Sequence, residues 1–117
     1  MYDGIDLTTA LMDTLQDCNN AVAQLMNDGI AMASARQKYR VAIAKKQLEL
    51  REVEKLPATL INDVSRGDPD CAALKFDLER CEVAYEATKQ RIMLRKREAD
   101  IIREQINREY AQRGLNG

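Results

Sequence analysis

The side chains best suited to a chemical task form a basic cluster in the second half of the chain. Arg95–Arg97 is a run of three basic residues, and Lys89 and Arg91 stand one to two helical turns before it. Such a cluster can neutralise phosphates, so Arg91, Lys96 and Arg97 are candidate nucleic-acid contacts. Acidic residues interrupt the same segment, and a charge run on a long helix is usually only a solvated face. Nucleic-acid binding is therefore the less favoured of two functional interpretations.

The residue types needed for catalysis or metal binding are scarce. The chain has no histidine, no GxSxG or GxxxxGK motif, and three cysteines, Cys18, Cys71 and Cys81, without CxxC spacing. An odd number of cysteines without histidine favours neither a disulfide framework nor a zinc site. We therefore expect no enzyme, no cofactor and no metal, with the cysteines as small buried residues in a reducing compartment.

Composition points to long solvated helices. Aromatic residues make up 4% of the 117 residues and charged residues 32%, which disfavours a core built on large rings. The formal net charge of -1 gives no overall attraction to nucleic acid or to an anionic membrane. No apolar run approaches the roughly 20 residues of a membrane span, and the N-terminus has no signal-peptide pattern. We expect a soluble cytoplasmic protein without membrane contact.

Heptad spacing predicts an all-α fold with two long helices, 6–55 and 69–113, joined by a connecting segment, 56–68, in one domain over 1–117. Ten of thirteen positions in the first helix and eight of eleven in the second are apolar at coiled-coil spacing. The first helix contributes Leu11, Leu15, Cys18, Val22, Leu25, Gly29, Met32, Arg36, Tyr39, Ile43, Lys46, Leu50 and Val53. The second contributes Leu74, Leu78, Cys81, Tyr85, Thr88, Ile92, Arg95, Ala99, Ile102, Ile106 and Glu109.

The connecting segment carries both a stop signal and a start signal. Pro57 cannot continue a helix. Gly67 suits a tight turn, Asp68 is a good N-cap and Pro69 fits the first helical position. Thr59–Ser65 is expected to form one or two turns of helix.

Charge favours an antiparallel pairing of the two long helices. Residues 1–28 hold five Asp and no Lys or Arg, whereas 36–51 hold six basic residues against one Glu. Both stretches meet opposite charge only if the chain reverses, which predicts an antiparallel coiled-coil hairpin. For the register we expect Tyr39 opposite Tyr85 and Arg95 opposite Gly29.

A second apolar line runs along both helices away from the first. Its candidate partner-binding residues are Ile30, Val41, Leu48, Phe76, Leu94 and Ile101. A two-helix hairpin cannot bury two lines per helix. One interpretation is that two hairpins form a homodimer, a four-helix bundle; the other is that the line binds a different protein. Both interpretations can hold at once.

The connecting segment offers three more candidate partner-binding residues, Leu60, Ile61 and Val64. They are apolar residues in the short segment where the chain turns, and few neighbouring side chains are expected there to bury them. They either plug the end of the hairpin or form a partner-binding tip.

The stretch LPATLINDVSRGD at 56–68, with QINREY at 105–110, resembles small coiled-coil proteins of uncertain function from phages and prophages of Gram-positive bacteria. The resemblance covers about residues 40–110 and implies a phage setting, in the host-cell cytoplasm, without a catalytic residue. We therefore expect a non-enzymatic protein-interaction module, an inhibitor or adaptor of a larger host-defence or replication/recombination complex. The alternative is a nucleic-acid-associated accessory protein of phage replication or recombination. The protein partner is not identified by the sequence.

Overall fold

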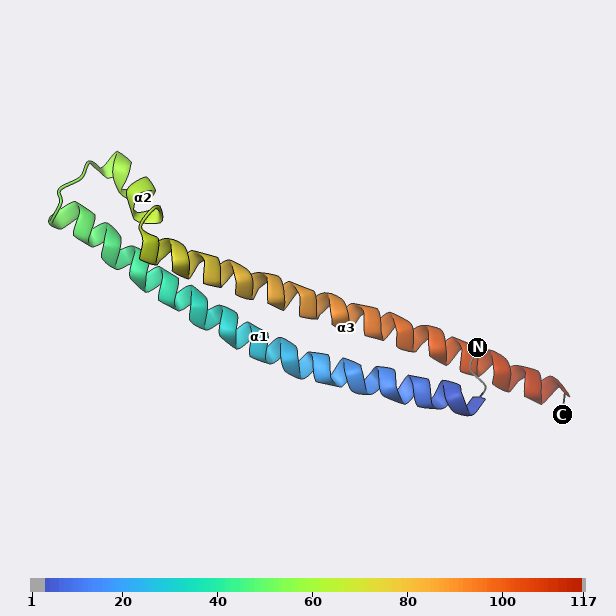
Figure 1. Ribbon diagram of the computed structural model, residues 1–117. Coiled ribbons are helices and arrows are strands. Elements are labelled where there is room, and N and C mark those ends of the chain that lie inside the picture. The colour runs from blue at the N-terminus through green and yellow to red at the C-terminus, as the bar shows by residue number, and fades with distance from the viewer. Residues whose placement is uncertain (1–3, 117) are drawn as a thin grey trace. The chain divides into compact units, whose positions relative to one another are not determined.

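The computed structural model describes residues 4–116, which form three helices and no strand (Figure 1). Helix α1 spans Gly4–Glu52, α2 spans Ala58–Arg66 and α3 spans Pro69–Asn116. The all-α prediction is confirmed. The chain divides into two compact units, one of 1–26 with 86–117 and one of 27–85, which are described separately below. That the whole chain is one domain stays a prediction.

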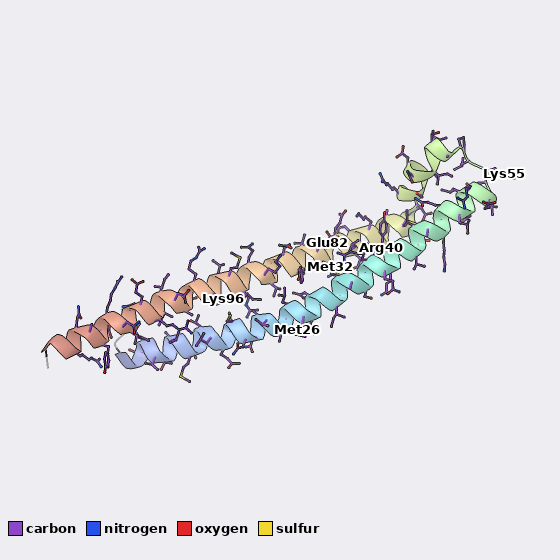
Figure 2. All side chains as sticks on the ribbon, turned by 180° about the vertical axis from the view of Figure 1, so that it is seen from behind. Met26, Met32, Arg40, Lys55, Glu82 and Lys96 are labelled. Carbon is purple, nitrogen blue, oxygen red and sulfur yellow. The ribbon has the colours of Figure 1, made fainter. Side chains whose placement is uncertain are left out.

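In the unit of residues 27–85, α1 and α3 run antiparallel and pack along a seam, the line where their side chains meet. Its core is formed by Ala35, Leu78 and Cys81, with Met32 and Tyr39 packed against them. In Figure 2, Met32 on α1 lies beside the part of α3 that carries Glu82. The chain reverses through α2, as predicted for a helical hairpin (Figure 1).

The seam positions of α3 agree with the predicted heptads. Five of its eleven predicted seam residues are buried, and the other six are half-buried. The buried ones are Leu78, Cys81, Ile92, Ala99 and Ile102.

The seam of α1 differs from the prediction, because its most buried line consists largely of small residues. Thr14, Ala21 and Ala35, spaced by multiples of seven, are buried, whereas Val22 and Val53 of the predicted seam are exposed. Small side chains let two helix backbones approach closely, so a line of alanines can serve as a seam without large apolar residues.

The predicted register is wrong. Gly29 packs against the Tyr85 ring, not against Arg95: a Cβ placed at Gly29 would lie 3.5 Å from a ring carbon of Tyr85. Further along the same unit, Nζ of Lys46 lies 3.6 Å from Oδ1 of Asp68. The reason is that α2 folds back along α1, where Gln47 donates a 3.1 Å hydrogen bond to the Asn62 side chain. Asp68, which precedes the first residue of α3, therefore lies beside Lys46 and not beside Glu52, the last residue of α1.

Helix α1 ends at Glu52, three residues before its predicted end. Lys55 has a left-handed backbone with φ of 54°. The Leu56 amide donates to the Leu50 carbonyl at 3.0 Å, which closes the last turn. Left-handed residues commonly end helices in this way. Pro57 then blocks any continuation.

Replacing Lys55 by glycine is expected to raise the free energy of unfolding by about 0.5–1 kcal/mol. Glycine adopts positive φ without the steric cost that a side chain meets there. Urea unfolding followed by circular dichroism measures the change. Glu54→Gly is the matched control and should be neutral or destabilising, since no positive φ is found there. A loss of stability in Lys55→Gly would contradict the left-handed cap.

Helix α3 begins at Pro69, as predicted. Asp68 is its N-cap, because its carboxylate accepts a 3.1 Å hydrogen bond from the Cys71 amide. Two adjacent residues therefore set the start of α3: Asp68 caps its first turn, and Pro69 has the backbone angle that the first helical position needs.

In the unit of residues 4–26 and 86–116, the first part of α1 packs against the second part of α3 (Figure 1). Leu7 and Ala21 are fully buried there. Asp17 forms ion pairs with Arg91 and Arg95, the latter at 3.0 Å. Arg95 was predicted at the seam opposite Gly29; its observed partner is Asp17. Opposite charges thus meet between α1 and α3 at Asp17, but not, within residues 4–116, at the predicted Arg103, Arg108 and Arg113: Arg103 pairs with Asp100 and Arg108 with Glu104 of their own helix. Asp3 lies outside the described residues.

Candidate protein-interaction surfaces

The second apolar line, called the outer line below, lies on the surface of both helices. All six of its candidate residues, Ile30, Val41, Leu48, Phe76, Leu94 and Ile101, are exposed, and so are Met26 and Val83 at the same spacing. Phe76, the only phenylalanine of the chain, is 69% exposed. The sequence patterns missed Met12 and Met93, which are also exposed. Large exposed apolar side chains in a strongly charged chain mark candidate contact surfaces.

Within residues 27–85, the outer lines of the two helices lie outside the seam. Ile30 lies two residues from the half-buried Met32, and Phe76 lies two residues from the buried Leu78. Two residues correspond to about 200° around a helix, so neither side chain points into the seam. Phe76 nevertheless lines a hollow with Tyr39 of α1, so the outer line of α3 is not turned fully away from α1. Homodimerisation itself stays a prediction.

A shallow groove with apolar and basic lining lies between α1 and α3 at Val41. Its apolar lining is Val41, Ala42 and Leu74, and its basic lining is Lys38 and Lys45. Gln37 completes the lining. We call it the basic groove. Lys38 and Lys45 are exposed and form no ion pair within residues 4–116, so their charges are available to a partner.

Phe76 belongs to a different face of α3. With the exposed Glu79 and Val83, three and seven residues further on, it forms what we call the Phe76 ridge. Phe76 and Glu79 line a hollow with Tyr39, Arg66, Ala72 and Lys75, so two cations and one carboxylate meet there. The Lys75 ammonium stands 5.2 Å from the Tyr39 ring centroid. Because Phe76 stands two residues beyond Leu74, its side chain points away from the basic groove of its own chain.

The three candidate residues of the connecting segment fall into two groups. Ile61 is half-buried and lines a hollow with Ala44 and Leu48 of α1, whereas Leu60 and Val64 are exposed. Ser65 is fully buried, and its hydroxyl donates to the Asn62 carbonyl at 3.0 Å. The side of α2 with Ile61 and Ser65 is therefore a plug, and the side with Leu60 and Val64 is accessible.

Asp68 stabilises the fold as an ionised group. The hydrogen bond from the Cys71 amide, assisted by Lys46, holds the pKa of Asp68 below its ordinary value of 3.8. A carboxyl with a lowered folded-state pKa contributes stability that is complete above the ordinary value. That contribution is lost as the pH falls from 3.8 through the lower folded-state value.

We therefore expect the melting temperature to fall between about pH 5 and pH 2.5, and to fall less in Asp68→Asn. Asparagine keeps a capping oxygen but cannot lose a charge. Thermal melts at both pH values measure the difference. Asp63→Asn, an exposed position on α2, should behave like the natural chain. An unchanged acid response in Asp68→Asn would show that the capping carboxylate does not carry this effect.

The basic cluster is largely neutralised by the protein's own carboxylates. Arg91 and Arg95 pair with Asp17, Arg95 also pairs with Glu98, and Lys89 pairs with Glu86 at 3.3 Å. The Arg91 side chain holds the pKa of Asp17 below its ordinary value, as expected for a close ion pair. Lys96 and Arg97 are exposed and form no ion pair within residues 4–116. Two cations remain from a cluster of five.

Few groups in the described residues could support chemistry. In residues 4–116 no three His, Cys, Asp or Glu side chains gather in a way that could hold a metal ion. Cys71 and Cys81 are buried and Cys18 is half-buried, all as free thiols. Burial raises the pKa of the Cys71 thiol, which disfavours the reactive thiolate. Among the same residues, no helix is long and apolar enough to cross a membrane.

Comparison with known proteins adds no relative. No family model matches the chain, and neither a curated protein nor a solved structure matches it.

Proposed function

We propose that this chain is a non-enzymatic protein-interaction module. The observation that supports this most directly is the exposure of large apolar side chains along the outer lines of α1 and α3. Amphipathic helices bind partner grooves through residues at such spacing. The resemblance to phage proteins suggests the setting, an inhibitor or adaptor of a larger host-defence or replication/recombination complex in the host-cell cytoplasm.

Recovery of partners by a tagged chain from infected or lysogenic cells tests this proposal. Ile30→Asp places a charge on the outer line, and Asn27→Asp places the same charge one turn earlier on the same helix. Both positions are exposed, so we expect both variants to keep the stability of the natural chain within about 0.5 kcal/mol.

We expect the natural chain and Asn27→Asp to recover the same protein, and Ile30→Asp to lose it. Urea unfolding confirms that the loss is not a loss of fold. Recovery of the same proteins by all three chains, or of none above background, would contradict binding through the outer line of α1.

The alternative function, binding to nucleic acid, has little free charge to support it. We expect no shift of single-stranded or duplex DNA in a gel at low salt, because only Lys96 and Arg97 of the basic cluster lack an ion pair within residues 4–116. The control is Lys96→Ala with Arg97→Ala. Binding that weakens steeply with salt, and less steeply in this double variant, would favour the alternative.

A further inference from the structure

The end of α1 has no part of α3 opposite it. Asp68, which precedes α3, pairs with Lys46, and α3 runs from there antiparallel to α1 (Figure 1). Residues 47–52 of α1 therefore lie beyond the start of α3. Leu50 is nevertheless 1% exposed. The side chains that cover Leu50 must therefore belong mainly to the segment between the two long helices, residues 53–67, which contains α2.

Polar contacts dominate the attachment of α2 to α1. The side-chain amide of Gln47 donates hydrogen bonds to Asn62 Oδ1 at 3.1 Å and to Ser65 Oγ at 3.5 Å. Ser65 is also the one buried residue of α2. Of the large apolar residues of α2, only Ile61 is half-buried, and the other two are exposed. An attachment with so few buried apolar contacts belongs to the least stable part of a fold.

Helix α2 is also too short to persist without these contacts. It has nine residues, and no side chain caps its N-terminus at Pro57. Isolated helices shorter than about 12–15 residues are marginal in water, so α2 depends on α1. The seam does not depend on α2 in return, because its core of Ala35, Leu78 and Cys81 includes no residue of α2.

We infer that α2 is a lid, which leaves α1 and loses its helical structure in one step while the seam of α1 and α3 stays folded. Opening uncovers Leu50 and removes Ile61 from the hollow that it lines with Ala44 and Leu48. Leu48 belongs to the outer line of α1, so the closed lid is an autoinhibitory contact at the end of that line. The inference rests on the proposed function, because the lid regulates access to the same surface.

Hydrogen–deuterium exchange of the full chain, followed by mass spectrometry of its peptides, tests the lid. We expect the amides of 60–67 to exchange at least about tenfold faster than those of 32–39 and 75–82, which contain the core of the seam. In Gln47→Ala, exchange in 60–67 should rise further, on the order of tenfold, because two hydrogen bonds to α2 are lost. Exchange in the seam should stay within about twofold of the natural chain.

Gln37→Ala is the matched control, since Gln37 is an exposed glutamine of α1 that lines the basic groove and not the contact with α2. It should leave exchange in 60–67 unchanged.

A second measurement follows the uncovering of position 50 itself. Leu50→Cys is treated with N-ethylmaleimide, and the modified peptides are identified by mass. We expect the thiol at position 50 to react on the order of tenfold faster when Gln47→Ala is added, because the lid then opens more often. The buried Cys81 of the seam is the internal control, and its reaction rate should not change.

Three results would overturn the inference. They are exchange in 60–67 as slow as in the seam, an equal rise of exchange in both regions in Gln47→Ala, and a maleimide reaction at position 50 that Gln47→Ala does not change. None of these measurements needs a partner, so each result would leave the proposed function intact. Recovery of the same proteins by Ile30→Asp and the natural chain would instead remove the autoinhibitory role and leave the opening itself.

Discussion

Replacing Leu50 by alanine is expected to lower the free energy of unfolding by about 2–5 kcal/mol. Leu50 is 1% exposed and is one of the largest fully buried side chains. It stands where the last turn of α1 is closed by the hydrogen bond from the Leu56 amide. Truncation removes buried methyl groups and leaves a cavity at this turn. Urea unfolding followed by circular dichroism measures the loss.

The matched control is Leu48→Ala, which makes the same chemical change two residues earlier. Leu48 is 52% exposed, so its truncation should cost less than about 1 kcal/mol. Equal losses in the two variants would contradict the observed orientation of α1, in which Leu50 is buried and Leu48 belongs to the outer line.

Replacing Ala35 by leucine is expected to lower the free energy of unfolding by about 1–3 kcal/mol, although leucine is the larger apolar residue. Ala35 is buried and packs with Leu78 and Cys81. The seam has no room for three more carbons unless α1 and α3 move apart. Differential scanning calorimetry of the variant, against the natural chain, measures the change.

Ala33→Leu is the control for this second substitution. Ala33 is exposed on the same helix, and the change there should stay within about 0.5 kcal/mol. A neutral or stabilising Ala35→Leu would mean that α1 and α3 are not closely packed at this point, and that the small residue is incidental.

The start and the seam of α3 were predictable from the sequence, because a local capping signal sets the start and large apolar residues form most of the seam. The end was not: α3 continues to Asn116, three residues beyond the predicted Arg113. Asp68 and Pro69 carry a start signal in two residues. Leu78, Ile92 and Ile102 are large apolar residues, which heptad patterns detect readily. The seam of α1 was less visible because Ala21 and Ala35 are small, and alanine is equally common on exposed helix surfaces.

The register could not be predicted from the two long helices alone. The heptad pattern repeats every seven residues, and the charged stretches are long, so several registers satisfy both. The observed one depends on α2, which lies back along α1 through Gln47 and Asn62 and brings Asp68 beside Lys46. That contact joins residues distant in sequence, which a periodic pattern does not contain.

The candidate surfaces were partly predictable. Spacing identified the outer line of α1 and α3, and its exposure is observed at Ile30, Val41 and Phe76. Spacing did not show that Leu74 joins Val41 in a groove, or that Phe76 lies on another side of the same chain. These relations depend on how the two helices meet.

Photo-crosslinking in cells that express the chain tests most directly whether the outer lines are protein contact surfaces. A benzophenone amino acid replaces Phe76 in one chain and Leu48 in another, and the exposed Asp70 in a control chain. We expect protein adducts from Phe76 and Leu48 and none from Asp70. The adduct mass separates a second copy of this chain from a different protein. Adducts of equal yield from all three positions, or none from Phe76 and Leu48, would contradict this expectation.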